Sequence, residues 1–126
     1  DGQPFLNMVV AADTSLPLAT MAARLRQIET EHGRPLHATR FSARRLDIDI
    51  LTYGDLVGEH DGISLPRGEI LDNAFVLRPL AELAPTALHP GNGLSYATLW
   101  RGYQQQSQIL VRVDFAWQGR WISRAE

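Results

Sequence analysis

Residues 40–54 read RFSARRLDIDILTYG, where charge, strand pattern and spacing combine. From Leu46 to Tyr53, apolar and polar residues alternate as they do in a β-strand, which places Asp47 and Asp49 on the same face. The Cα atoms of two such residues lie about 6.5–7 Å apart on a strand, close enough for both carboxylates to reach one divalent cation or a close pair of cations. The stretch predicts a strand with a metal-binding polar face.

Arginines lie just upstream of this strand, at Arg40, Arg44 and Arg45, with Arg34 a little further back. Guanidinium groups bind phosphate oxygens through paired hydrogen bonds, while paired carboxylates hold Mg²⁺, which itself bridges phosphates. Together the two groups suggest a metal–nucleotide site. The alternative is a solvated strand face, on which the aspartates pair with the arginines as surface salt bridges of little energetic consequence.

A family resemblance favours the metal–nucleotide reading. The segment RFSARRLDIDIL closely resembles the signature of 6-hydroxymethyl-7,8-dihydropterin pyrophosphokinase, with Ser42 where that pattern prefers Gly or Ala. The likeness extends from Phe5-Leu6-Asn7 to FVLRPLAELAP at residues 75–85, and covers about residues 1–100. Residues 101–126 would then be a C-terminal extension of one pterin pyrophosphokinase-like domain spanning 1–126.

The resemblance implies a fold class of α+β, with a ferredoxin-like sheet packed with helices. The strand-helix-strand segment that begins this family is absent, so we expect the fold to be truncated at the N-terminus. The alternation of Ile109 to Trp117 predicts an extra C-terminal strand. We expect this strand to fill the vacant place in the sheet, either within its own chain or from a partner chain, which would make a homodimer. The alternative is a fragment whose start lies elsewhere.

The resemblance also implies an activity. It is transfer of a pyrophosphoryl group from ATP, the co-substrate, to 6-hydroxymethyl-7,8-dihydropterin with release of AMP, a transferase (kinase) reaction of folate biosynthesis. Asp47 and Asp49 would hold two Mg²⁺ ions. Arg40 and Arg44 would clamp the leaving and transferred phosphates as catalytic residues. The resemblance assigns nucleotide-binding positions to Glu29, Arg34, Arg40, Arg44, Ser64 and Arg67. For Glu29, a solvated helix carboxylate is an equally good reading.

Pterin-binding positions fall by resemblance at Phe5, Asn7 and Phe75. The residues alone leave simpler alternatives open. Asn7 lies in the apolar stretch Phe5 to Asp13, which reads as an interior strand, and a buried Asn can instead serve the local backbone. Phe75 is most simply a core residue of a short helix between Ala74 and Leu83, which we expect Pro79 to interrupt.

Three positions depart from the family pattern. Arg67 stands where the family has His, and Leu36 and Asn73 stand where it has basic residues. These departures, with the absent opening segment, keep a second function open. The chain could be a catalytically impaired homologue or fragment that acts as a pterin- or nucleotide-binding or interaction module. An active enzyme is the reading we favour, because both aspartates and two of the arginines are retained.

Composition limits the remaining choices. The 126 residues suffice for one domain, and a net charge of −2 argues against general affinity for nucleic acid. No apolar run is long enough for a membrane span, and there are no cysteines, which fits a soluble cytoplasmic protein.

Apolar residues at helical spacing predict two further helices. One has roughly 16 residues, is capped by Thr14 or Ser15 and ends near Gly33, and the other spans Leu94 to Tyr103.

Overall fold

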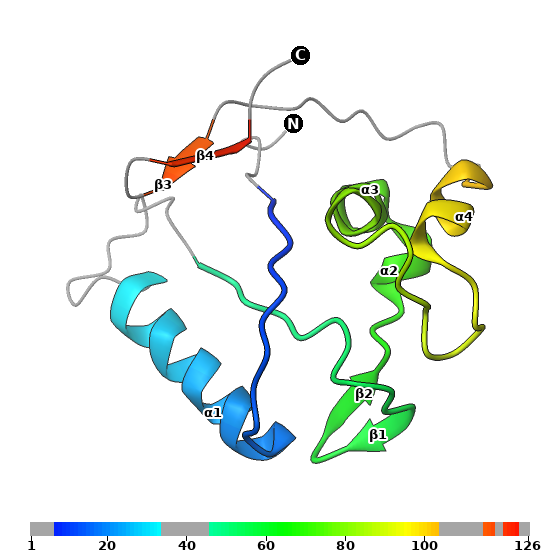
Figure 1. Cartoon of the computed structure of the whole chain (residues 1–126). Coiled ribbons are helices and arrows are strands. Elements are labelled where there is room, and N and C mark those ends of the chain that lie inside the picture. Colours follow the sequence, from blue (N-terminus) through cyan, green and yellow to red (C-terminus); the bar gives the residue numbers. More distant parts are fainter. Residues whose placement is uncertain (1–6, 34–45, 104–114, 118–119, 124–126) are drawn as a thin grey trace.

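The computed structural model describes residues 7–33, 46–103, 115–117 and 120–123 (Figure 1). This part of the chain is an α+β structure with two separate two-stranded antiparallel sheets. Its elements, in chain order, are α1 (Leu18–Ile28), the π-helical turn η1 (Glu29–Gly33), β1 (Gly58–His60), β2 (Ile63–Leu65), α2 (Glu69–Asp72), α3 (Ala74–Leu83), α4 (Tyr96–Arg101), β3 (Phe115–Trp117) and β4 (Arg120–Ser123). None of the helices in the described ranges combines the length and apolar character that a membrane crossing needs.

The first predicted helix is confirmed. It consists of 11 α-helical residues followed by 5 π-helical residues that end at Gly33. Leu18 and Ala22 are the buried residues of α1. The predicted cap is wrong, because the N-cap is Pro17 and makes no side-chain cap hydrogen bond. The Thr14 hydroxyl instead accepts the backbone N–H of Leu16 at 3.0 Å, which stabilises the turn before the helix.

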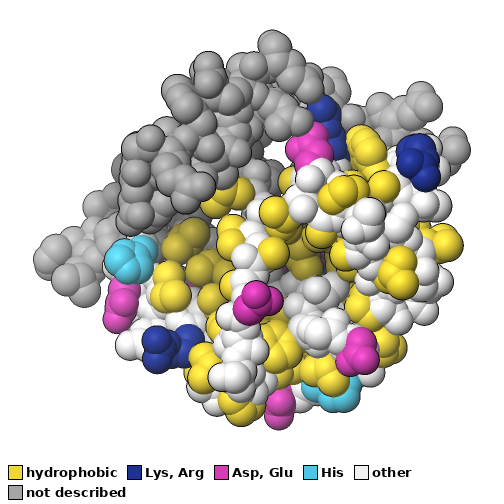
Figure 2. All heavy atoms as spheres, in the orientation of Figure 1, with side chains coloured by type: hydrophobic (Ala, Val, Ile, Leu, Met, Phe, Trp, Pro, Cys, Tyr) yellow, Lys and Arg dark blue, Asp and Glu magenta, His cyan; other side chains and the backbone are white. Residues whose placement is uncertain are grey.

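Two predicted strands are not formed in the described part of the chain. Residues 7–13 and 46–53 carry no strand assignment, and Asn7 is exposed, whereas we expected it to be buried in an interior strand. Val10 is 72% exposed. A strand is defined by a hydrogen-bonded neighbour, and none of the described strands pairs with either segment. Figure 2 shows the hydrophobic side chains that remain at the surface, gathered around a hollow on this face.

A β-hairpin of β1 and β2 follows, with Glu59 paired to Ser64 and His60 to Ile63. Its two-residue loop is Asp61-Gly62, and both residues have positive φ, 55° and 78°. This geometry is that of a type I′ turn, which suits the right-handed twist of paired strands and favours an Asp-Gly sequence.

The hydrophobic core lies among α2, α3 and α4. Its buried members are Ile70, Val76, Leu77, Leu80, Ala81 and Tyr96. Helix α3 runs without a break through Pro79, so the predicted interruption is wrong. Proline removes one backbone hydrogen bond and crowds the preceding turn. Burial of the apolar face of α3 offsets this cost, since its residues on both sides of Pro79 belong to the core.

Helix α4 confirms the last predicted helix, at a shorter length. Ser95 is its N-cap and accepts the backbone N–H of Thr98 at 3.1 Å.

The loop before α4 is organised by His89, which is 5% exposed. Its Nδ1 accepts the backbone N–H groups of Gly91 and Asn92 at 3.0 and 3.1 Å. The imidazole must therefore be neutral, with its proton on Nε2.

The predicted C-terminal strand is confirmed at Phe115–Trp117, which forms β3. Within the described residues β3 pairs with β4, with Trp117 opposite Arg120. Residues 109–114 lie outside the described residues. Sheet completion by this strand therefore stays a prediction, and the described part of it belongs to a local hairpin.

Candidate functional site

A pocket of about 670 Å³ lies between α1 and the hairpin. Four stretches of the chain line it: one face of α1, residues 48–50, the loop and second strand of the hairpin, and α2 with the two residues before it. The lining residues are Ala22, Leu25, Arg26, Ile48, Asp49, Ile50, Gly62, Ile63, Ser64, Arg67, Gly68, Glu69 and Asp72. The pocket thus joins segments that are widely separated in the sequence.

The aspartate segment is not a strand, and the predicted alternation holds only at residues 47–50, because Leu46 is 39% exposed and residues 50–53 are all half-buried. Asp47 and Asp49 are exposed, while Ile48 and Ile50 are half-buried and face the pocket. Asp49 lines the pocket, and Asp47 is not among its lining residues. The described residues hold no cluster of three or more His, Cys, Asp or Glu side chains suited to a metal ion. Two carboxylates are nonetheless a normal protein contribution to a Mg²⁺ site completed by water and phosphate.

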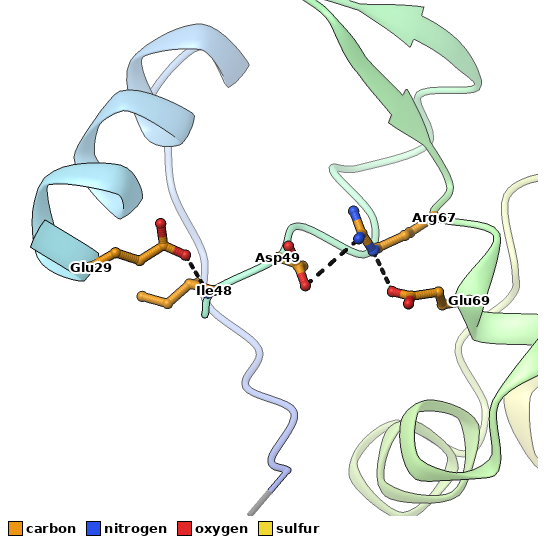
Figure 3. Close-up of polar contacts among 5 residues, drawn as sticks. All are labelled: Glu29, Ile48, Asp49, Arg67 and Glu69. Carbon is orange, nitrogen blue, oxygen red and sulfur yellow. Dashed lines mark hydrogen bonds and ion pairs between the residues drawn. The ribbon is translucent and has the colours of Figure 1, made fainter. Parts of the chain in front are cut away.

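Glu29 has a role that neither sequence reading anticipated. Its Oε2 accepts the backbone N–H of Ile48 at 2.5 Å, which ties η1 to the residue between the two aspartates (Figure 3). The bond is partly buried and has a charged acceptor, the kind that contributes most to stability. The Tyr53 hydroxyl makes a second tie by donating to the carbonyl oxygen of Leu16, just before α1. These two bonds hold the aspartate segment against both ends of the helix.

Arg67 is the basic centre of the pocket. Its Nε donates to Glu69 Oε1 at 2.6 Å, and its Nη2 lies 3.7 Å from Asp49 Oδ2 (Figure 3). The hydrogen bond to Glu69 raises the pKa of Arg67, against the lowering effect of burial and with help from the charge of Asp49. Arg67 is therefore a permanent cation between two carboxylates. Its backbone N–H is also fixed, since it donates to the carbonyl oxygen of Leu51 at 2.8 Å.

The pocket brings together some of the predicted site residues and not others. Asp49, Ser64 and Arg67 line it, and Glu29 supports it. Asn7 and Phe75 are not among its lining residues, and Phe75 packs half-buried against the hydrophobic core. The predicted residues Phe5, Arg34, Arg40 and Arg44 lie outside the described residues, as does Leu36.

Sequence reasoning missed Arg26, Glu69 and Asp72, which also line the pocket. Two of them carried a signal. Arg26 lies about one helical turn before Glu29, so the sequence places the two side chains near each other at the end of the helix. Glu69 follows Arg67 by two residues, a spacing at which an acid can neutralise an arginine locally.

These features define a class of protein: an α+β domain in which an acidic segment and an arginine meet at one pocket. A family model for 7,8-dihydro-6-hydroxymethylpterin-pyrophosphokinase matches residues 1–85. The chain belongs to this family.

Curated relatives agree with the family match. The chain is 39% identical over 85 residues to the 2-amino-4-hydroxy-6-hydroxymethyldihydropteridine pyrophosphokinase of Pseudomonas aeruginosa, covering 68% of this chain and 52% of that protein. The Haemophilus influenzae protein of the same name is 30% identical over 92 residues, covering 73% and 57%. A folate synthesis bifunctional protein of Chlamydia caviae is 36% identical over 93 residues, covering 74% of this chain and 21% of that protein. The chain thus spans about half the length of the first two relatives.

Proposed function

We propose that this chain transfers a pyrophosphoryl group from ATP to the hydroxymethyl group of 6-hydroxymethyl-7,8-dihydropterin and releases AMP, as a transferase of folate biosynthesis. The observation that carries the proposal is the meeting of Asp49, Ser64 and Arg67 at one open pocket in a chain of this family. At one pocket, an acid can bind the metal, a serine hydroxyl can bond a ribose hydroxyl or donate to a phosphate oxygen, and a guanidinium can donate to the phosphate oxygens of a nucleotide.

The phosphates are bound by arginines in this proposal. Arg26 and Arg67 place two cations on the pocket wall. Arg40 and Arg44, which precede the aspartate segment in the sequence, would bind the phosphates, and Arg34 would add a further nucleotide contact. Guanidinium donors stabilise the charge that develops on transferred phosphoryl oxygens. Positioning and electrostatics therefore supply most of the rate.

The donor set fits Mg²⁺. Asp47 and Asp49 offer hard carboxylate oxygens that are exposed to solvent, and Asp49 opens onto the pocket where a nucleotide has room. Bound Mg²⁺ would supply positive charge that neutralises the phosphate oxygens. We propose two ions, held by Asp47 and Asp49. Glu29 fixes the backbone between the carboxylates, which limits the positions they can take.

We also propose that Phe5, Asn7 and Phe75 bind the pterin. Asn7 is exposed, so its amide is accessible to a ligand as donor and acceptor. Phe75 is half-buried on the core, which leaves part of its ring available for stacking on a flat heterocycle.

In the complete fold we propose a single domain over 1–126, with a ferredoxin-like sheet in which residues 7–13 and 46–53 acquire strand partners. The exposed apolar side chains of Met8 and Val10 support this, because pairing in a covered sheet would bury them. Residues 109–117 would supply a partner strand, from the same chain or from a second copy in a homodimer. We place the protein in the cytoplasm, where folate synthesis and a cysteine-free chain are compatible.

One observation favours the second candidate function, a pterin- or nucleotide-binding homologue without turnover. Arg67 is engaged by Asp49 and Glu69, and Asn73 and Leu36 lack the positive charge that the family pattern carries at those positions. Fewer cations at the phosphates would weaken stabilisation of the transition state more than binding of the substrates in their ground state.

An assay for AMP release with ATP, Mg²⁺ and 6-hydroxymethyl-7,8-dihydropterin tests the proposal. We expect pterin-dependent AMP from the chain, and a loss of at least about a hundredfold in Asp49→Ala, as when a main electrostatic group is removed. Asp55→Ala is the matched control, because Asp55 is an exposed acid a few residues further along and outside the pocket. No AMP from a folded chain that still binds ATP or pterin would refute turnover and support the binding module.

A further inference from the structure

Three charged side chains form a row along the pocket wall: Glu69, Arg67 and Asp49 (Figure 3). Arg67 uses different edges of its guanidinium for its two partners. Its Nε hydrogen bonds to Glu69 at 2.6 Å, whereas its Nη2 faces Asp49 at 3.7 Å, beyond hydrogen-bond length. The first contact is a hydrogen-bonded ion pair and the second is an ion pair only.

The two contacts therefore differ in strength. Glu69 is two residues from Arg67 at the start of α2, so the local chain holds that pair together. Asp49 comes from a different segment, and its side chain is 52% exposed while that of Arg67 is 38% exposed. Exposed ion pairs are weak and are screened by salt, so Arg67 can leave Asp49 at little cost. It can do so without releasing Glu69.

Arg67 also lies close to the place where Asp49 would hold a metal ion. A divalent cation bound by the Asp49 carboxylate would lie close to the guanidinium, whose Nη2 is 3.7 Å from Asp49 Oδ2. Two cations so close together repel, and only one of them can neutralise the carboxylate fully.

We propose that Arg67, anchored by Glu69, is an internal counter-cation of Asp49 that a divalent cation must displace before it binds this carboxylate. Glu69 is then a positioning residue. After displacement it keeps the guanidinium at the pocket, with its Nη groups turned to an anionic oxygen of the incoming ligand. The inference rests on the proposed function only in taking Asp49 as a cation ligand.

The test is Mn²⁺ binding to the chain without nucleotide or pterin, followed by electron paramagnetic resonance of the free ion. In Arg67→Gln we expect Mn²⁺ to bind about twofold to fivefold more tightly, the range that corresponds to losing an exposed ion pair. The gain should shrink at high salt. Arg101→Gln is the matched control, since it makes the same charge change on an exposed residue of α4 outside the pocket, and it should leave Mn²⁺ affinity unchanged.

A second measurement keeps Arg67 itself in place and follows its guanidinium directly. Titration with Mg²⁺ should shift the Arg67 Nε–Hε resonance in the wild-type chain, because the guanidinium leaves Asp49, and should not shift it in Asp49→Asn. Equal Mn²⁺ affinity in wild type and Arg67→Gln, together with an unmoved resonance, would overturn the proposal. If Asp49→Asn still weakens Mn²⁺ binding in that case, the proposed metal site stands and only displacement fails. If Asp49→Asn has no effect on Mn²⁺ binding, both fail.

Discussion

The hydrogen bond from Ile48 to Glu29 should be the main tie between the aspartate segment and α1. Glu29→Ala removes the carboxylate that accepts the backbone N–H of Ile48 at 2.5 Å. The partly buried N–H then loses this acceptor. Hydrogen bonds to charged groups contribute about 1.5–3 kcal/mol, and an orphaned partner costs a similar amount. We expect the free energy of unfolding to fall by about 2 kcal/mol, a large share of the 5–15 kcal/mol typical of a domain.

Urea unfolding followed by circular dichroism measures this loss. With a slope of about 2 kcal/mol per molar urea, the midpoint should drop by about 1 M. Glu31→Ala is the matched control, because Glu31 is an exposed acid on the same π-helical turn whose nearest contacts are 3.4 Å to Gln27 and 3.9 Å to His32. Its loss should cost no more than about 0.5 kcal/mol. Glu29→Gln should fall between the two, since the amide oxygen still accepts but carries no charge.

The reasoning fails if Glu29→Ala and Glu31→Ala have the same midpoint. That outcome would mean that the carboxylate of Glu29 is solvated and that the aspartate segment is held by other contacts. The solvated-carboxylate reading of the sequence would then be correct.

Three further predictions concern the scaffold around the pocket. Leu77→Ala should lower the free energy of unfolding by about 2–5 kcal/mol in urea titrations, because Leu77 is 1% exposed in the core, while Leu83→Ala, at 46% exposure on the same helix, should cost far less. Gly62→Ala should destabilise the fold by about 1 kcal/mol because of its φ of 78°, whereas Gly68→Ala, at a φ of −61° and with open space around it, should be neutral or stabilising. Equal thermal midpoints for the two variants would contradict the type I′ turn at Asp61-Gly62. Burial lowers the pKa of His89, so below about pH 6.5 the folded chain binds fewer protons than the unfolded chain, and the contribution of His89 to the free energy of unfolding should fall as the pH drops. Urea titrations at several pH values should show this slope in the wild-type chain and a flatter one in His89→Ala.

Local structure followed from local sequence. The helix that ends at Gly33 was predicted from apolar residues at helical spacing. Errors arose where distant packing opposed a local preference. Pro79 predicted a helix break, but the apolar face of α3 packs into the core and keeps the helix continuous. Residues 7–13 read as an interior strand, yet a strand needs partners that the described chain does not provide.

The family, the polar face that carries Asp47 and Asp49, and the candidate positions Ser64 and Arg67 could be predicted without a structure. The shared polar face follows from the local alternation of residue types, whereas the family and the two candidate positions come from resemblance to a known sequence pattern. Only the tertiary structure decided that Glu29 binds the backbone of Ile48, 19 residues away, and that Arg67 stands between Asp49 and Glu69. Such contacts depend on how separate segments pack against one another, and residue spacing within one segment carries no record of that geometry.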